Sequence, residues 1–154
     1  MTNSGTKSIS KQLSKNDSGE TGGHQAGMLI PKRDEILNFF PKLDESQKNP
    51  RVAMHFTDKS GKIWKMNFIY YNNRFFGGTR NEYRLTGMTA YFRESNLKAG
   101  DEVTLTRSNN QLSIDYKRVN VSATREVMDD GKKKTVLVLG GGWKVIDYYK
   151  EVEK

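Results

Sequence analysis

The chain has 154 residues, the size of one domain, with no cysteine and only two histidines. This composition excludes a disulfide framework and a thiolate metal site, and it leaves few ligands for zinc. A net charge of +8 and a pI near 9.6 favour a polyanionic partner, most often nucleic acid. The sequence shows neither a signal-like apolar region nor a membrane span, so we expect a soluble, cytoplasmic protein that does not bind membranes.

The N-terminal residues are polar and lack hydrophobic periodicity. We therefore expect residues 1–13 to be a disordered leader, followed by a single domain over residues 14–154. The glycine-rich stretch SGETGGHQAG (18–27) places a histidine and a glutamine just before the first hydrophobic run. It is either slack leader sequence or an arm whose backbone and short polar side chains contact a partner outside the fold.

The next segments predict a helix and a hairpin. Residues 28–43 predict one short helix, because Pro31 suits a first turn and Pro41 ends it. Apolar and polar side chains alternate over residues 52–57 and 63–71, on either side of the turn DKSGK. This period of two predicts a β-hairpin.

The second half of the chain predicts mainly strands. Residues 72–87 begin with two asparagines and contain a glycine pair, which indicates a loop or ribbon, and residues 89–103 predict a second short helix. Further strands are predicted at 103–107, 111–118, 135–140 and 143–149. Since helices and strands do not alternate regularly, we expect a mostly β fold, an antiparallel barrel or sandwich with two short helices.

The positive charge is concentrated in residues 62–98, where seven Lys and Arg stand against two Glu among many aromatic side chains. The segment RFFGGTRNEYR (74–84) contains side chains that can read base edges: arginine pairs with guanine, glutamate with the cytosine amino group and asparagine with adenine. In an extended ribbon Arg80, Glu82 and Arg84 project to one side and predict contact with G·C pairs. A surface turn with compensating charges explains the same residues equally well.

Two other chemistries fit parts of the sequence. Asp101, Asp115 and Lys117 partly match the carboxylate pattern of metal-dependent nucleases, but their segments are typical of a turn and an amphipathic strand. Exposed aromatic side chains would also suit a general binder of RNA or single strands. The structural interpretation of the carboxylates is favoured.

Three stretches together resemble a known family. Residues 14–32, 69–86 and 91–105 are similar to the effector domain of the EcoRII restriction endonuclease, which shares an open seven-stranded pseudobarrel with plant B-three transcription-factor domains. The resemblance implies an N-arm (about residues 15–27) and a C-arm (about residues 73–86) that enter the major groove of duplex DNA from opposite sides.

The resemblance also implies which residues contact DNA. In the N-arm these are Asn16, Asp17, Ser18, Gly22, Gly23, His24 and Gln25, and in the C-arm Arg74, Thr79, Arg80, Asn81, Glu82, Tyr83 and Arg84. It implies sequence-specific binding of a short G·C-rich site by a monomer, with no cofactor, metal or catalytic residue in this domain. Cleavage would come from a partner nuclease domain, in the same chain or in trans, in a prokaryotic cytoplasm.

Three positions depart from the family pattern. Gly78 and Tyr83 stand where the EcoRII pattern has lysines, and Leu29 stands where it has a tyrosine. The loss of two cationic contacts suggests a target that need not be the CCWGG site of EcoRII. A nuclease in its own right and a stand-alone protein resembling a transcription factor remain the alternatives.

Overall fold

The computed structural model describes residues 6–18, 27–118, 133–138 and 142–149. These residues form a single sheet of nine strands together with short helices. The strands are β1 (Thr6–Gln12), β2 (Gly27–Ile30), β3 (Arg51–Thr57), β4 (Ile63–Tyr71), β5 (Glu82–Thr86), β6 (Glu102–Ser108), β7 (Gln111–Lys117), β8 (Lys133–Val138) and β9 (Trp143–Tyr149). The helices are α1 (Lys15–Ser18), α2 (Asp34–Leu37), α3 (Thr89–Glu94) and the 3-10 turn η1 (Asn73–Phe76).

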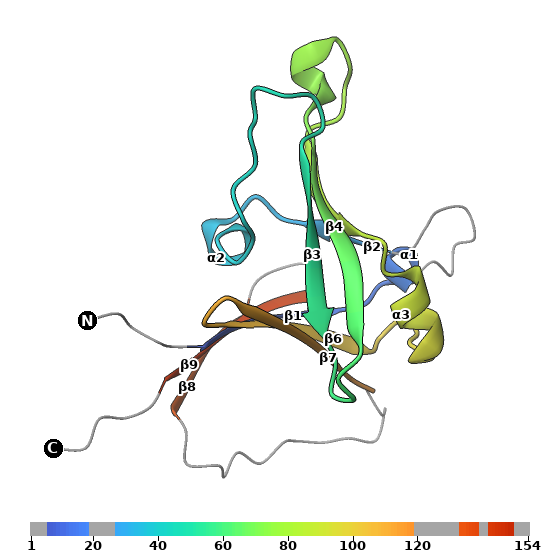
Figure 1. Cartoon of the computed structure of the whole chain (residues 1–154), viewed down its shortest axis with the longest axis vertical. Coiled ribbons are helices and arrows are strands. Elements are labelled where there is room, and N and C mark those ends of the chain that lie inside the picture. The colour runs from blue at the N-terminus through green and yellow to red at the C-terminus, as the bar shows by residue number, and fades with distance from the viewer. Residues whose placement is uncertain (1–5, 19–26, 119–132, 139–141, 150–154) are drawn as a thin grey trace, which may run out of the picture.

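The strand order is β2-β5-β4-β3-β7-β6-β1-β9-β8. The described pairings are antiparallel, apart from a short parallel contact between β3 and β7. In Figure 1 the β3–β4 hairpin stands upright, with its lower end crossing the strands β1, β6 and β7 and η1 beyond its upper end. The mostly β architecture with short helices is confirmed, and the C-arm projects from the body of the sheet.

The β3–β4 hairpin follows the predicted alternation. Met54 and Phe56 on β3 and Met66 and Phe68 on β4 are buried in the core. Between the strands the Asp58 carboxylate accepts hydrogen bonds from backbone and side-chain donors of the turn. Local sequence therefore determines both the strands and the turn that joins them.

The prediction of a disordered leader is wrong for residues 6–12, which form β1. This strand lies between β6 and β9 and pairs with both. Ile9 is fully buried, and the Ser10 hydroxyl bonds to the Thr104 hydroxyl across the β1–β6 pair at 2.7 Å. A polar strand is stable here because both of its edges are paired and its hydroxyl groups have partners.

Two other strands were not predicted as such. Residues 28–30 lie in the segment 28–43 that predicts a helix, but with Gly27 they form β2 and pair with β5. The segment interpreted as a loop or ribbon contains β5, which pairs with β4 as well. With the six strands predicted from the sequence, β1, β2 and β5 make nine in the described part of the chain, where the resemblance implied seven.

The two predicted helices are present but short. Ile36 of α2 and Tyr91 and Phe92 of α3 are buried against the sheet. Phe40, just after α2, stacks on Phe68 of β4 with ring centres 4.5 Å apart. Within the described residues, no helix is long and apolar enough to cross a membrane.

Candidate nucleic-acid interface

The two faces of β5 have different roles. Arg84 lies opposite Ile69 on β4, and Ile69 lies opposite Arg51 on β3, so these three share the outer face of the sheet. Tyr83 and Leu85 lie on the other face, toward the core. Strand alternation thus places Arg51 and Arg84 on the face opposite Tyr83 and Leu85.

Arg80, Glu82 and Arg84 project to the same side, as the spacing predicted. Arg80 Nη2 lies 2.9 Å and Arg84 Nη1 3.4 Å from Glu82 Oε2. Burial raises the pKa of Glu82, but the hydrogen bonds and charges of the two arginines outweigh it and hold the pKa below its usual value. The three side chains therefore carry one net positive charge at neutral pH, with both donors and acceptors.

The ring of Tyr71 supports one of these arginines. The Arg80 guanidinium carbon lies 3.8 Å from the ring centre of Tyr71, a cation–π contact that fixes the plane of the guanidinium. An oriented guanidinium can donate two parallel hydrogen bonds to guanine or phosphate with less loss of side-chain entropy.

A network of hydrogen bonds within the C-arm fixes the tip that carries η1. The Arg80 backbone N–H donates to Asn73 Oδ1 at 2.7 Å, and the Arg74 backbone N–H donates to the Arg80 carbonyl at 2.9 Å. Gly77 has a φ of +91°, which favours glycine. Arg74 and Thr79, both predicted to contact DNA, are exposed on this closed loop.

A buried asparagine joins the tip to a second loop. Asn72 donates to the carbonyls of Glu45 and Gln47, and its Oδ1 accepts from the Asn49 N–H at 2.7 Å. Moving the tip away from this loop would break the hydrogen bonds of Asn72 and leave buried polar groups without partners. Because that is costly, these bonds hold the base of the tip in place.

Asn81 and Tyr83, also predicted to contact DNA, point the other way. The Tyr83 ring stacks on Tyr70 with ring centres 4.1 Å apart, and Tyr70 Oη donates to Asn81 Oδ1 at 2.6 Å. Burial, followed by the nearby Glu45 charge, raises the pKa of Tyr83 to about 12. Asn81 and Tyr83 alternate with the three outward side chains. They therefore lie on the opposite face of the C-arm, where they pack against Tyr70.

The described part of the N-arm is the single turn α1. Asp17, predicted to contact DNA, is buried beside Lys11 Nζ and accepts from the Ser14 N–H at 2.9 Å. It therefore anchors the arm to β1. Ser18 is half-buried and Asn16 is exposed. The predictions for Gly22, Gly23, His24 and Gln25 lie outside the described residues.

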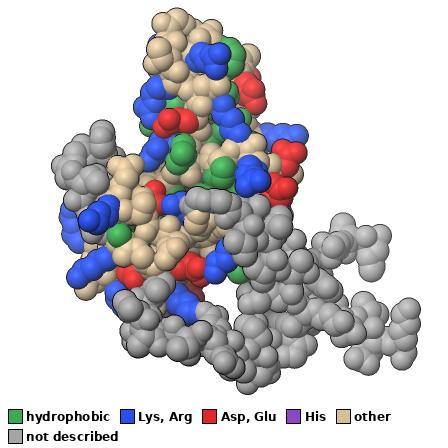
Figure 2. All heavy atoms as spheres, turned by 180° about the vertical axis from the view of Figure 1, so that it is seen from behind, with side chains coloured by type: hydrophobic (Ala, Val, Ile, Leu, Met, Phe, Trp, Pro, Cys, Tyr) green, Lys and Arg blue, Asp and Glu red, His purple; other side chains and the backbone are tan. Residues whose placement is uncertain are grey.

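A groove of about 550 Å³ lies between Asn16, the strands β3 and β4, and the C-arm. We call it the arm groove, and its polar lining comes from Asn16 of the N-arm, from β3 and β4, and from the C-arm. These polar lining residues are Asn16, Arg51, Asn67, Tyr71, Arg80, Arg84 and Thr86. In Figure 2, Lys and Arg side chains lie along the projecting upper end of the molecule, with hydrophobic side chains between them.

Arg51, Asn67 and Tyr71 were missed by the sequence reasoning. Their signal was available: Arg51 and Asn67 occupy the positions that alternate with the buried residues of β3 and β4. An outward-facing arginine beside a basic arm is a candidate for binding an anion.

The carboxylates of the nuclease alternative do not form one site. Asp101 Oδ2 accepts from the Lys98 N–H in a turn, whereas Asp115 lies on β7 opposite Thr104. Thr104 is three residues from Asp101, so the two backbones are separated by about 10 Å along the strand. Within the described ranges, no cluster of three or more His, Cys, Asp or Glu could hold a metal ion.

Comparison with known proteins identifies the family. The model of the family described as "Restriction endonuclease EcoRII, N-terminal" matches residues 2–111. The chain belongs to this EcoRII N-terminal family. Over 79 residues, 49% of this chain and 19% of the other, it is 42% identical to the type II restriction enzyme EcoRII of Escherichia coli.

The plant resemblance is confirmed as well. This EcoRII N-terminal domain is 35% identical over 86 residues to the AP2/ERF and B3 domain-containing transcription factor RAV1 of Arabidopsis thaliana, covering 54% of this chain and 23% of the other. It also shares its fold with a solved "Arabidopsis FUS3-DNA complex", with a TM-score of 0.56 and 19% identity over 72% of this chain and 96% of that one. The chain spans about a fifth of the length of the two curated relatives.

Proposed function

We propose that this chain binds short duplex DNA sequence-specifically, with its two arms in the major groove. The arm groove carries the proposal, because residues from the N-arm, the C-arm and the central strands meet there in a cationic, polar hollow. Membership of the EcoRII N-terminal family and the fold shared with a protein solved in complex with DNA support it.

The C-arm has suitable chemistry for reading bases. The major groove of B-DNA is about 12 Å wide and admits a two-stranded ribbon. Arg80 and Arg84 offer guanidinium forks for guanine, and the ionised Glu82 can accept from the amino group of cytosine. We therefore expect G·C pairs where the C-arm docks.

The wider role follows from the relatives. We propose that the chain is the recognition domain of a restriction endonuclease, acts as a monomer on DNA without a cofactor, and directs a nuclease domain in the same chain or in trans. The 42% identity with EcoRII supports this role, and the B3 relatives support a stand-alone transcription factor as the alternative. We expect a prokaryotic cytoplasm.

Selection from a randomised duplex library, followed by fluorescence anisotropy on the retained sequence, tests the proposal. We expect a preferred duplex, weaker binding to a scrambled duplex and weaker binding still to either single strand. The affinity should fall steeply with salt, since each neutralised phosphate releases counterions. An affinity that does not change between dilute and physiological salt, or a preference for single strands, would contradict it.

A cleavage assay separates binding from catalysis. Plasmid incubated with the purified chain and Mg²⁺ should remain supercoiled, because Asp101 and Asp115 do not share a site in this structure. Nicking that is lost in Asp115→Asn would instead favour the nuclease alternative.

A further inference from the structure

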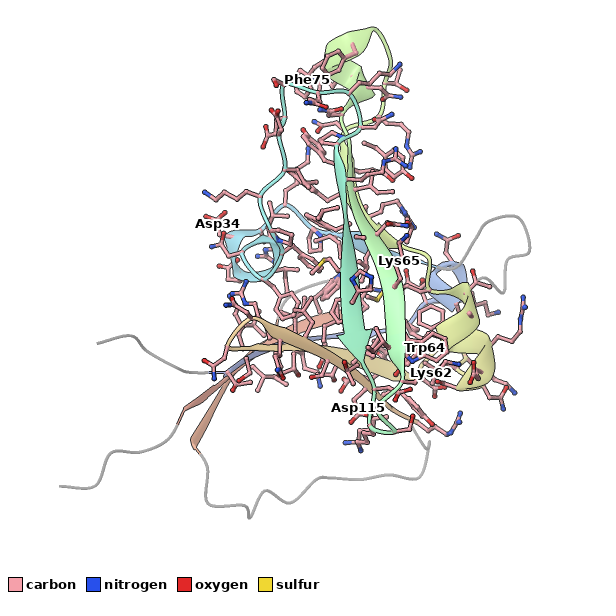
Figure 3. The ribbon with its side chains drawn as sticks, in the orientation of Figure 1. Asp34, Lys62, Trp64, Lys65, Phe75 and Asp115 are labelled. Carbon is pink, nitrogen blue, oxygen red and sulfur yellow. The ribbon has the colours of Figure 1, made fainter. Side chains whose placement is uncertain are left out.

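Two phenylalanines occupy the outermost part of the C-arm. The residue exposure is 65% for Phe75 and 44% for Phe76. Figure 3 places Phe75 at one end of the molecule, with Lys62, Trp64 and Asp115 at the other. Single exposed apolar residues are normal on protein surfaces, but two adjacent phenylalanines at the end of a cationic arm form an apolar contact surface.

The backbone that carries these rings is fixed before any ligand binds. The Gly78 N–H donates to the Asn73 carbonyl, and the Phe75 N–H donates to the Asn72 carbonyl at 3.0 Å. With Asn72 buried and bonded to the neighbouring loop, the tip loses little backbone entropy on binding. A tip held in this way presents its rings in a defined position.

We propose that Phe75 and Phe76 contact the C5-methyl group of a pyrimidine in the major groove, beyond the base pairs that Arg80 faces. This inference deepens the proposed function and rests on it. The C5-methyl group is the apolar feature of base edges in that groove, and phenylalanine is a side chain that contacts it. Arg74, exposed beside the rings, supplies positive charge toward the adjacent phosphates. Thymine and 5-methylcytosine present the same group.

Modified duplexes test the contact one methyl group at a time. In the preferred duplex, each thymine is replaced singly by uracil, and each cytosine singly by 5-methylcytosine. For the unmodified protein we expect an effect at one position. Either removing a thymine methyl group there weakens binding about fourfold, or adding a cytosine methyl group there strengthens binding by a similar factor. This size is that of one buried methyl group. Phe75→Ala or Phe76→Ala should bind the parent duplex more weakly and lose sensitivity at that position alone.

Matched variants identify the source of the effect. Ile63 is 63% exposed at the opposite end of β4, so Ile63→Ala removes a similarly exposed apolar side chain and should keep the full methyl sensitivity. The uracil duplexes test for a contact with thymine, and the 5-methylcytosine duplexes test for a contact with methylated cytosine. The proposal is overturned if both alanine variants keep the methyl response, or if they change only self-association in sedimentation velocity. Failure of the unmodified protein to bind any duplex would overturn the proposed function and this inference together, whereas binding without methyl coupling overturns this inference alone.

Discussion

Glu82 shows how one side chain can serve both the free and the bound protein. Both arginines contact its Oε2, so in the free domain it holds them on the outer face. In the proposed complex with DNA, the same carboxylate would accept a hydrogen bond from the cytosine amino group. Because its pKa is lowered, Glu82 is ionised at any pH above the usual pKa of a glutamate. We therefore expect that protonation of Glu82 does not change the DNA affinity near neutral pH.

We predict that Arg80→Ala weakens binding to the preferred duplex by about 1–3 kcal/mol and relaxes discrimination at one base pair. The reason is that Arg80 is oriented by Tyr71 and Glu82 toward the arm groove. Anisotropy titrations against all four base pairs at each position measure the effect. An equal loss on preferred and scrambled duplexes would show that Arg80 contacts phosphate only.

Lys62→Ala is the control for that experiment. Lys62 pairs with Glu94 at 2.9 Å and lies over Trp64, at the end of the molecule opposite Phe75. We expect DNA affinity at physiological salt to change little. A loss as large as that for Arg80→Ala would mean that charge alone, and not position, determines binding.

Among the elements, β1 most clearly shows what local pattern cannot reveal. The strand alternates serines with Ile9 and lysines, which by itself indicates no core. Its stability comes from β6 and β9, which are distant in sequence, and long-range pairing is absent from any local window. The β3–β4 hairpin, by contrast, carries its period of two and its turn residues within one segment, and it was predicted correctly.

We predict that Ile9→Ala lowers the free energy of unfolding by about 2–5 kcal/mol, as for a fully buried isoleucine. Urea unfolding followed by circular dichroism measures it. Gln12→Ala on the same strand removes an exposed side chain and should stay within about 0.5 kcal/mol of the unmodified protein. If both variants were equally stable, β1 would not belong to the cooperative core.

The turn between β3 and β4 should titrate in acid. The hydrogen bond from Trp64 Nε1, then those from Ser60 and the turn backbone, lower the pKa of Asp58 from 3.8 to about 2. Because the pKa of Asp58 is lower in the folded chain than in the unfolded chain, its ionised carboxylate stabilises the fold at any pH above the unfolded pKa. This contribution is lost as the pH falls from about 4 toward 2. Asp58→Asn should therefore be less stable than the unmodified protein at pH 6, and the difference in melting temperature should shrink toward pH 2. A constant difference would contradict the assignment.

Across the whole molecule, the residue types of the candidate interface and one row of the C-arm were predictable from sequence, but the arrangement that the sheet gives them was not. Arg80, Glu82 and Arg84 could be placed on one side from spacing alone, and the same alternation should have turned Tyr83 inward. Gly78, a departure from the family's lysine, has a local reason: an added Cβ would lie 2.9 Å from Asn73 Cγ, so a larger residue needs a rearranged tip. The position of Arg51 could not be predicted from local sequence, because only the β3–β4–β5 register places it across β4 from Arg84 on the same face of the sheet.

That juxtaposition yields a prediction about the domain as a whole. Arg51 lies in the arm groove but in neither arm, so we expect it to meet the DNA backbone between the two arms. Arg51→Ala should then weaken binding to all duplexes by a similar factor and reduce the slope of log affinity against log salt by about one. Lys59→Ala removes the same charge far from the groove, where Lys59 pairs with Asp115, and it should leave the slope unchanged. If Arg51→Ala instead changed the preferred base at one position, Arg51 would read a base edge, and the central strands would share in recognition with the arms.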